Sequence, residues 1–393
     1  MIGISKLYCG TVSEGDVLRY GDKNLPANLL QFARVKKPII VWNSLQKCNL
    51  KCVHCYINAD DKRYKDELTT EQAKKMITEL AEYKAPVFLF SGGEPVIRPD
   101  LFELADFAKA AGMRVVLSTN GTLITTEVAK KLKDSDFSYI GISLDGIGEV
   151  NDKFRGVKGA FEKAREGFRN CVKAGLKSGL RLTLTKGNID DLPEIFNFIE
   201  NEGINRACFY HLVYSGRGKD LIKEDVPLER KREIVDYIIE RTVKFQEKGY
   251  NKDILTVDNH TDGVYLYLKL RKIDPKRAAS VLKLLQYTGG NSTGIGIACI
   301  DCFGNVHPDQ FWRNQTFGNI KDRKFGDIWD DTSNPIMKGL KDRKKLLKGR
   351  CGRCVWVDIC NGNFRARAEA VYDDPWMEDP ACYLTEEEIS TRV

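Results

Sequence analysis

The sequence lacks any long apolar run, and no stretch approaches the roughly 20 apolar residues that a membrane-spanning helix needs. The N-terminus, Met1 to Lys6, has neither the charged block nor the apolar block of a signal peptide. No internal repeat or low-complexity tract is present. These absences predict a cytoplasmic protein with no membrane partner.

A strong excess of one charge is also missing. The 62 Lys and Arg residues exceed the 55 Asp and Glu residues by 7, and the excess is dispersed. Basic residues are concentrated only in the segment from Lys341 to Arg353, which has seven of them and one acidic residue, Asp342. We interpret this segment as a solvated helix face. This balance does not favour nucleic acid as a partner, although it suits an anionic substrate.

Disulfides are not expected either, because the cytoplasm is reducing and 393 residues, 42% of them hydrophobic, can form a sizeable core in more than one domain. The twelve cysteines are therefore interpreted mainly as metal ligands. Cys48, Cys52 and Cys55 lie close together. Three thiolates can hold a four-iron cluster and leave one iron open to a small molecule.

An alternative is a buried helical stripe, since offsets of zero, four and seven share one helix face. The preceding residues 37–43 read as a strand that enters a loop, and the cysteines begin where this strand ends. The loop, and with it metal chemistry, is the favoured interpretation.

Strand-like and helix-like segments alternate between residues 38 and 218, which predicts parallel βα units. Six units are too few for a closed eight-stranded barrel, so the predicted fold is α/β, a partial (βα)6 barrel followed by a C-terminal cluster domain. Polar or glycine-containing turns follow the strands and should line one shared site. The expected strands are Pro38–Asn43, Pro86–Ser91, Arg114–Thr119, Tyr139–Leu144, Ser178–Thr185 and Arg206–Tyr214.

Four regions follow from this pattern. Residues 1–36 form a lead segment that contains Cys9, and residues 37–218 form the partial barrel. Residues 219–290 look helical and charged, with Leu228 to Lys248 the clearest amphipathic stretch, and are expected to be a bridge. Residues 291–393 hold half of the cysteines and are expected to form the auxiliary domain.

A second cysteine group consists of Cys351, Cys354, Cys360 and Cys382. Four thiolates close an iron–sulfur cluster completely, and structural zinc is the main rival. Whether Cys9, Cys299 or Cys302 also bind metal stays open.

The turn Gly92-Gly93-Glu94-Pro95 follows a predicted strand. Its glycines allow a ligand to approach the backbone closely, and Glu94 can accept hydrogen bonds from an ammonium group. Taken alone, such a tetrapeptide is an ordinary turn.

Together, the cysteine loop and this turn about forty residues later resemble the radical S-adenosylmethionine (SAM) enzymes. The resemblance implies that SAM chelates the open iron of a 4Fe–4S cluster, and that an electron from a ferredoxin- or flavodoxin-type donor then releases a 5′-deoxyadenosyl radical. Glu94 would help to hold the SAM amino group, Gly92 and Gly93 would let SAM approach the backbone closely, and Tyr56 would lie against the adenine. The remaining implied contacts are Asn120, Ser143 and Asp145 to the ribose or methionyl part, and Arg155 to the carboxylate.

The C-terminal cysteines resemble the SPASM/twitch-like module, which implies a second, auxiliary 4Fe–4S cluster. The lead segment, including Leu18–Gly21 and Leu30–Phe32, and the Pro308–Gln310 turn resemble the radical SAM proteins of haem d1 and alternative haem synthesis. That resemblance implies removal of two acetate side chains from the iron tetrapyrrole 12,18-didecarboxysiroheme to give iron-coproporphyrin III, or related haem d1 chemistry.

Two other hypotheses remain. A SPASM-type peptide maturase often carries an N-terminal leader-binding domain, for which 36 residues are too few. A non-catalytic iron–sulfur or zinc protein would leave Glu94 and its glycines without a purpose.

A flat polycarboxylate macrocycle needs apolar walls and peripheral arginines. The candidate walls are Tyr210, His211, Tyr214, Phe311 and Trp312, and the candidate carboxylate partners are Arg181, Arg217, Arg365 and Arg367. The candidate ligands of the substrate iron are Cys9, His54, His211, His260 and His307.

Overall fold

The computed structural model describes residues 1–11 and 37–391. The segments Leu18–Gly21 and Leu30–Phe32, on which part of the family resemblance rests, lie outside the described residues. The described chain is built on one 11-stranded sheet with the order β1-β8-β7-β6-β5-β4-β3-β2-β9-β10-β11. The strands are β1 Ile2–Gly3, β2 Ile39–Asn43, β3 Val87–Ser91, β4 Arg114–Thr119, β5 Tyr139–Ser143, β6 Ser178–Leu184, β7 Arg206–His211, β8 Asp253–Val257, β9 Ile297–Ile300, β10 Asn305–His307 and β11 Gly318–Asn319.

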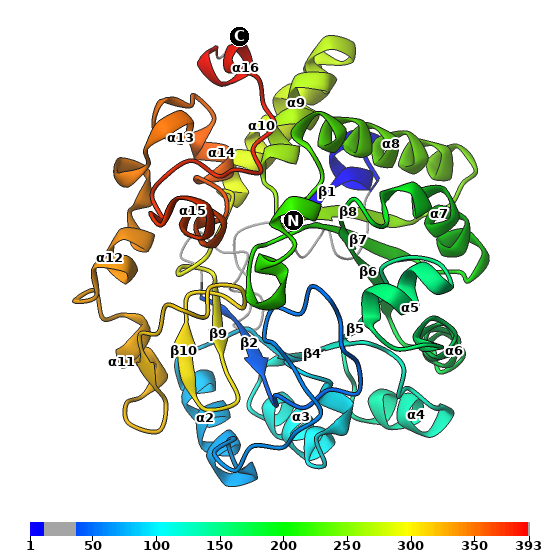
Figure 1. Cartoon of the computed structure of the whole chain (residues 1–393), viewed down its shortest axis with the longest axis vertical. Coiled ribbons are helices and arrows are strands. Elements are labelled where there is room, and N and C mark those ends of the chain that lie inside the picture. Colours follow the sequence, from blue (N-terminus) through cyan, green and yellow to red (C-terminus); the bar gives the residue numbers. More distant parts are fainter. Residues whose placement is uncertain (12–36, 392–393) are drawn as a thin grey trace.

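Strands β2 to β7 are parallel neighbours in chain order, as six consecutive βα units predict. Figure 1 shows them as an arc with the connecting helices on its outer side. All six predicted strands are confirmed, and the largest difference is that β7 ends at His211 rather than Tyr214. The partial barrel is therefore confirmed.

The helices begin and end where local chemistry predicts. Helix α2 opens on a capping box, in which Thr69 accepts from the Gln72 N–H and the Gln72 side chain accepts from the Thr69 N–H. Its apolar face then packs on the sheet. The amphipathic stretch at 228–248 forms α8. The helices are α2 Thr70–Glu82, α3 Leu101–Ala110, α4 Thr126–Asp134, α5 Glu149–Arg155, α6 Ala160–Lys173, α7 Leu192–Asn201, α8 Leu228–Glu247, α9 Thr261–Ile273, α10 Pro275–Thr288, α11 Phe325–Trp329, α12 Pro335–Lys341, α13 Gly349–Arg353, α14 Val357–Cys360, α15 Arg365–Tyr372 and α16 Glu386–Ser390.

The expectation that residues 219–290 are helical is wrong at 253–257. These residues form β8, which extends the parallel sheet beyond β7. The strand has only five residues, all of them buried, and charged helices precede and follow it in the sequence. In so short a run the hydrophobic period does not distinguish a strand from part of a helix. Strand β1 pairs antiparallel with β8, which places the N-terminus at this edge of the sheet.

The C-terminal region continues the other edge. Strand β9 pairs in parallel with β2, and β10 and β11 add antiparallel strands beyond it. The boundaries proposed at 218 and 291 therefore lie within one continuous sheet, and the four-region division stays a prediction.

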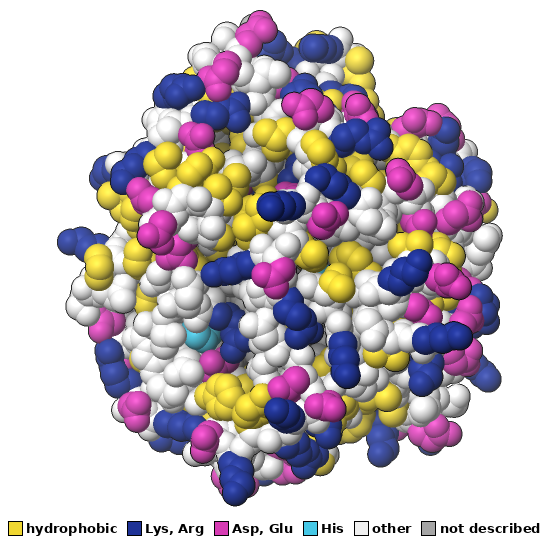
Figure 2. Space-filling model, in the orientation of Figure 1, with side chains coloured by type: hydrophobic (Ala, Val, Ile, Leu, Met, Phe, Trp, Pro, Cys, Tyr) yellow, Lys and Arg dark blue, Asp and Glu magenta, His cyan; other side chains and the backbone are white. Residues whose placement is uncertain are grey.

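No helix in the described ranges is long and apolar enough to cross a membrane. On the face drawn in Figure 2, basic and acidic side chains of the described residues are intermingled rather than gathered into a basic surface. This distribution agrees with the expectation that charge alone does not favour nucleic acid.

Ser5 ties the N-terminus to β8. Its hydroxyl donates to the Lys252 carbonyl (2.7 Å) and accepts from the Ile254 N–H (2.8 Å), and all three atoms are buried. We predict that Ser5→Ala lowers the free energy of unfolding by about 1–3 kcal/mol, because it leaves a buried N–H without a partner. Anaerobic denaturant titration followed by circular dichroism measures this change.

Ser390→Ala is the control, because its hydroxyl bonds to the Glu386 carbonyl at an exposed site. Its change should stay within about 0.5 kcal/mol. Equal stability of the Ser5 and Ser390 variants would contradict the proposed anchoring.

Candidate active site

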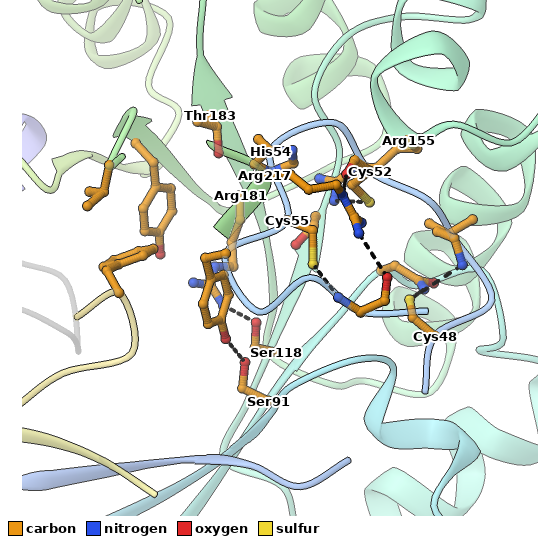
Figure 3. Close-up of a pocket in the computed structure, with 18 of the residues that line it drawn as sticks. Cys48, Cys52, His54, Cys55, Ser91, Ser118, Arg155, Arg181, Thr183 and Arg217 are labelled. Atoms are coloured by element: carbon orange, nitrogen blue, oxygen red, sulfur yellow. Dashed lines mark hydrogen bonds between the residues drawn. The ribbon is translucent and has the colours of Figure 1, made fainter. Parts of the chain in front are cut away.

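A cleft opens at the carboxyl ends of the parallel strands, where the turns were expected to meet (Figure 3). It holds about 970 Å³ of empty space, a volume that includes its open mouth. The lining residues that belong to the predicted site are Cys48, Cys52, Cys55, Tyr56, Gly92, Gly93, Asn120, Ser143 and Arg155.

The cysteines lie on a loop rather than a helix, which rules out the helical stripe. Backbone hydrogen bonds fix this loop to α5, since the Lys51 and Val53 N–H groups donate to the carbonyls of Arg155 and Phe154 (3.0 Å each). The Arg217 side chain fixes its other side by donating to the carbonyls of Cys52 (2.8 Å) and Ala59 (3.0 Å). Figure 3 shows the three cysteines together on this loop, beside Arg155.

The Gly92–Gly93 turn presses against the start of the same loop. The Gly93 N–H donates to the Leu45 carbonyl (2.8 Å), and the Glu94 N–H donates to the Lys47 carbonyl (2.9 Å). A Cβ on Gly93 would lie 2.0 Å from the Lys47 oxygen, and Gly92 has a φ of +116°. These glycines were expected to admit a ligand, but the backbone that approaches them most closely belongs to residues 43–47, at the start of the cysteine loop.

Glu94 is fully buried beneath the cleft. Its carboxylate accepts from the Thr119 hydroxyl (2.7 Å), the Asn120 N–H (2.8 Å) and the Val96 N–H (3.1 Å). Burial raises the pKa of Glu94, and the three donors oppose that rise. Glu94 thus joins the β3 turn to the end of β4 and does not itself line the cleft.

Asp145 is also buried, and it is paired with Arg155. It accepts from the Thr183 N–H (2.6 Å), while the Arg155 guanidinium also donates to the Cys52 sulfur (3.6 Å). Arg155 therefore lies between a carboxylate and one of the cysteines, with part of its surface on the cleft. Of this pair only Arg155 reaches the cleft.

Asn120 and Tyr56 both line the cleft and are held there by hydrogen bonds. The Asn120 amide donates to the Asn49 side chain (2.8 Å) and lies 3.8 Å from the Cys48 sulfur. The Tyr56 hydroxyl bonds with Asn43 (2.9 Å) and Ser91 (2.8 Å), which anchors the ring at the ends of β2 and β3. Ser143 lines the cleft from the end of β5.

Burial raises the pKa of the Cys48 thiol to about 12, and Glu94 adds to this effect. Burial also raises the pKa of Cys52, although Arg155 opposes it. Thiols in such a setting keep their protons until a cation replaces them, so metal binding must release protons here. Three sulfurs from one loop that line one cleft fit a cluster with an open iron.

The candidate substrate-binding residues divide into two groups. Tyr210, Phe311, Arg181 and Arg217 line the cleft, whereas Tyr214, Trp312, Arg365 and Arg367 do not, so these four are not cleft contacts. Arg365 donates to three backbone carbonyls near the C-terminal cysteines, and Arg367 pairs with Asp379 in the interior. Their burial with local acceptors is the physical reason that the sequence-based assignment is wrong.

Two of the four histidines, His54 and His211, line the cleft. Burial lowers the pKa of His54 to about 4, so this imidazole is neutral. His211 bonds to Asp262 (2.9 Å), which accepts in turn from the Tyr383 hydroxyl (2.7 Å). These buried hydrogen bonds connect His211 in the cleft wall to Tyr383, which directly follows Cys382.

The second cysteine group converges as well. Cys351, Cys354, Cys360 and Cys382 line one small cavity between α9, α13 and α14. Burial raises the pKa of Cys360, and the other three cysteines of the group add to the rise. Within the described residues no group of three or more His, Cys, Asp or Glu side chains is arranged to hold a single metal ion.

Three of the five remaining cysteines, Cys9, Cys299 and Cys302, had an open role in metal binding, and all three lie apart from this cavity. Cys299 on β9 is fully buried and accepts from the Asn43 amide (3.2 Å), Cys302 is buried in the following turn, and Cys9 is half-buried near Arg277.

Sequence reasoning missed Ser118, Thr183 and Asp258, which also line the cleft. Ser118 and Thr183 lie at or near the carboxyl ends of predicted strands, so strand alternation could have found them. Asp258 follows β8, and no signal was available while that strand was unrecognised.

The radical SAM superfamily model matches residues 42–199. Over 394 residues the chain is 58% identical to the Fe-coproporphyrin III synthase of Methanosarcina barkeri, covering 99% of this chain and 99% of that protein. It is 42% identical to the pre-heme d1 synthase of Dinoroseobacter shibae, covering 90% and 88% of the two chains. The chain belongs to the radical SAM superfamily.

A solved structure supports the fold. Streptococcus suis SuiB bound to S-adenosylmethionine aligns with a TM-score of 0.69 at 20% identity, covering 89% of this chain and 78% of SuiB. Membership in the superfamily makes the protein a radical SAM enzyme and implies a 4Fe–4S cluster and SAM.

We predict that Gly93→Ala displaces the cysteine loop, because the added Cβ would overlap the Lys47 carbonyl. After anaerobic reconstitution the variant should lose up to one cluster's iron and most SAM binding. Iron analysis and equilibrium dialysis with labelled SAM measure the two effects.

Gly187→Ala is the matched control, since its Cβ would meet only the Thr185 hydroxyl at 3.8 Å. Wild-type iron content and SAM binding in Gly93→Ala would refute the steric argument.

Proposed function

We propose that this enzyme removes the two acetate side chains of 12,18-didecarboxysiroheme and forms iron-coproporphyrin III. The observation that carries the proposal is the 58% identity to an Fe-coproporphyrin III synthase over 99% of both chains. The similarity to a pre-heme d1 synthase supports the same class of substrate.

The cleft chemistry agrees with a flat polycarboxylate. Tyr210 and Phe311 offer aromatic surfaces, and the Arg181 guanidinium lies 4.9 Å from the Tyr210 ring centre. Arg217 keeps one nitrogen, Nη2, without a hydrogen-bond partner in the described part of the chain. We propose these two arginines as contacts for substrate carboxylates.

Cys48, Cys52 and Cys55 are the proposed ligands of the SAM-binding cluster. The proposed SAM contacts from the cleft wall are Tyr56, Gly92, Gly93, Asn120, Ser143 and Arg155. Glu94 and Asp145 lie behind this wall, and we propose that they act through its geometry, by orienting Asn120 and Arg155.

We propose that Cys351, Cys354, Cys360 and Cys382 hold an auxiliary 4Fe–4S cluster. The four thiols share one cavity, and four thiolates close a four-iron cluster completely. A ferredoxin- or flavodoxin-type protein is the proposed electron donor. All twelve cysteines are free, which fits the reducing cytoplasm as the proposed location.

Reconstituted wild-type protein with SAM, reductant and didecarboxysiroheme should release acetate and form iron-coproporphyrin III under anaerobic conditions. Mass spectrometry of the tetrapyrrole measures the conversion. Cys52→Ala should abolish 5′-deoxyadenosine formation, because two thiolates cannot hold the cluster. An unchanged tetrapyrrole alongside active SAM cleavage would overturn the proposed substrate.

Cys382→Ala should lower the iron content by up to one cluster's worth while leaving the cysteine loop loaded. The C-terminal region should also lose stability, because metal binding and folding are coupled. Iron and zinc analysis of anaerobically purified protein provides the measurement. Stoichiometric zinc with only about four irons in the wild type would instead identify a structural zinc site.

A further inference from the structure

Asp258 is a cleft residue that none of the assigned roles uses. It follows β8, which is separated from β2 by five strands of the sheet, and it lines the same cleft as the three loop cysteines. The residue is only 7% exposed. It therefore brings a buried carboxyl group into the proposed substrate site.

The backbone of Asp258 is held by a hydrogen bond, whereas one of its two carboxyl oxygens has no such partner among the described residues. Its φ of +64° is left-handed, a conformation that aspartate and asparagine tolerate better than most residues. The Arg367 guanidinium donates to the Asp258 carbonyl (2.7 Å). In contrast, the buried Oδ2 atom has no hydrogen-bond partner among the described residues.

A buried carboxyl without a partner is costly unless it stays protonated or meets a ligand. Burial raises the pKa of Asp258 to about 7, and Asp309 adds to the rise, while Arg367, the N-terminal amine and Arg181 oppose it. Asp258 therefore holds a proton in a large fraction of molecules near neutral pH. Such a group can both donate and recover a proton under working conditions.

We propose that Asp258 is the acid that protonates the departing acetate group of the substrate. The inference rests on the proposed function and adds a catalytic residue to it. Asp258 lines the wall where the macrocycle would bind, and its Oδ2 atom has no hydrogen-bond partner among the described residues.

Hydrogen abstraction leaves a radical on the ring carbon next to the carbon that bears the side chain. The bond to the side chain then breaks homolytically, so that one electron completes a ring double bond and the other leaves on a carboxymethyl radical. That radical takes one electron from a reduced low-potential iron–sulfur protein or flavodoxin and one proton from Asp258, and becomes acetate. Solvent returns the proton to Asp258.

The test is Asp258→Asn, which keeps the size of the side chain and tolerates a left-handed φ but cannot supply the proton. With didecarboxysiroheme, the variant should form 5′-deoxyadenosine at the wild-type rate while acetate release falls by about 100-fold or more. In D2O, acetate released by the wild type should carry one solvent deuterium. Iron content and the thermal unfolding midpoint establish that the variant is folded and loaded.

Asp136→Asn is the matched control, since Asp136 is also left-handed (φ +52°) but is exposed on the surface. It should release acetate as the wild type does. Wild-type acetate release by Asp258→Asn would overturn the proposed acid, and so would a parallel loss of 5′-deoxyadenosine and acetate, which would mark a role in binding or folding. If the wild type itself releases no acetate, the proposed function fails, whatever Asp258 does.

Discussion

The close approach of two backbone segments positions the catalytic end of this protein. The Gly92–Gly93 turn donates two N–H groups to the carbonyls of Leu45 and Lys47, and it leaves no room for a side chain at Gly93. The start of the cysteine loop is thereby fixed to the end of β3. Glu94, from the same turn, extends this connection to the end of β4 by accepting from Thr119 and Asn120. The strands of the sheet are rigid, and through these hydrogen bonds they fix the position of the loop cysteines. A preorganised site requires such fixed positions.

The opposite wall of the cleft depends on the C-terminal region. Arg367 of α15 is fully buried with Asp379, and it donates to the carbonyls of Leu212 and Asp258, just beyond β7 and β8. A buried arginine with all of these acceptors is costly to disturb, because removing one partner leaves an uncompensated charge. The C-terminal region therefore fixes the strand ends that carry the proposed substrate contacts. In the same region, hydrogen bonds connect His211 through Asp262 to Tyr383, beside Cys382.

Much of the fold was predictable, because each of the six strands is a short apolar run followed by a turn. The cysteine loop was equally predictable from its spacing, and all three cysteines line one cleft. Strand β8 was not predictable, since five buried residues between charged helices show no distinctive hydrophobic period. Asp258 follows this strand, so its place in the cleft could not be predicted either. Arg365 and Arg367 were misassigned for a different reason. Sequence shows that an arginine is present but not whether backbone carbonyls or a buried carboxylate already satisfy it, as they do here.

The C-terminal cysteines lie on short elements of the fold. The segments that carry them are short, since α13 has five residues and α14 has four, and isolated helices of this length are unstable in water. Burial raises the pKa of the Cys351 thiol to about 11, so without a metal this thiol keeps its proton. A cluster held by four thiolates would instead cross-link α13, α14 and the loop before α16. The stability of this region, and through Arg367 the geometry of the cleft wall, would then depend on the metal that the four cysteines bind.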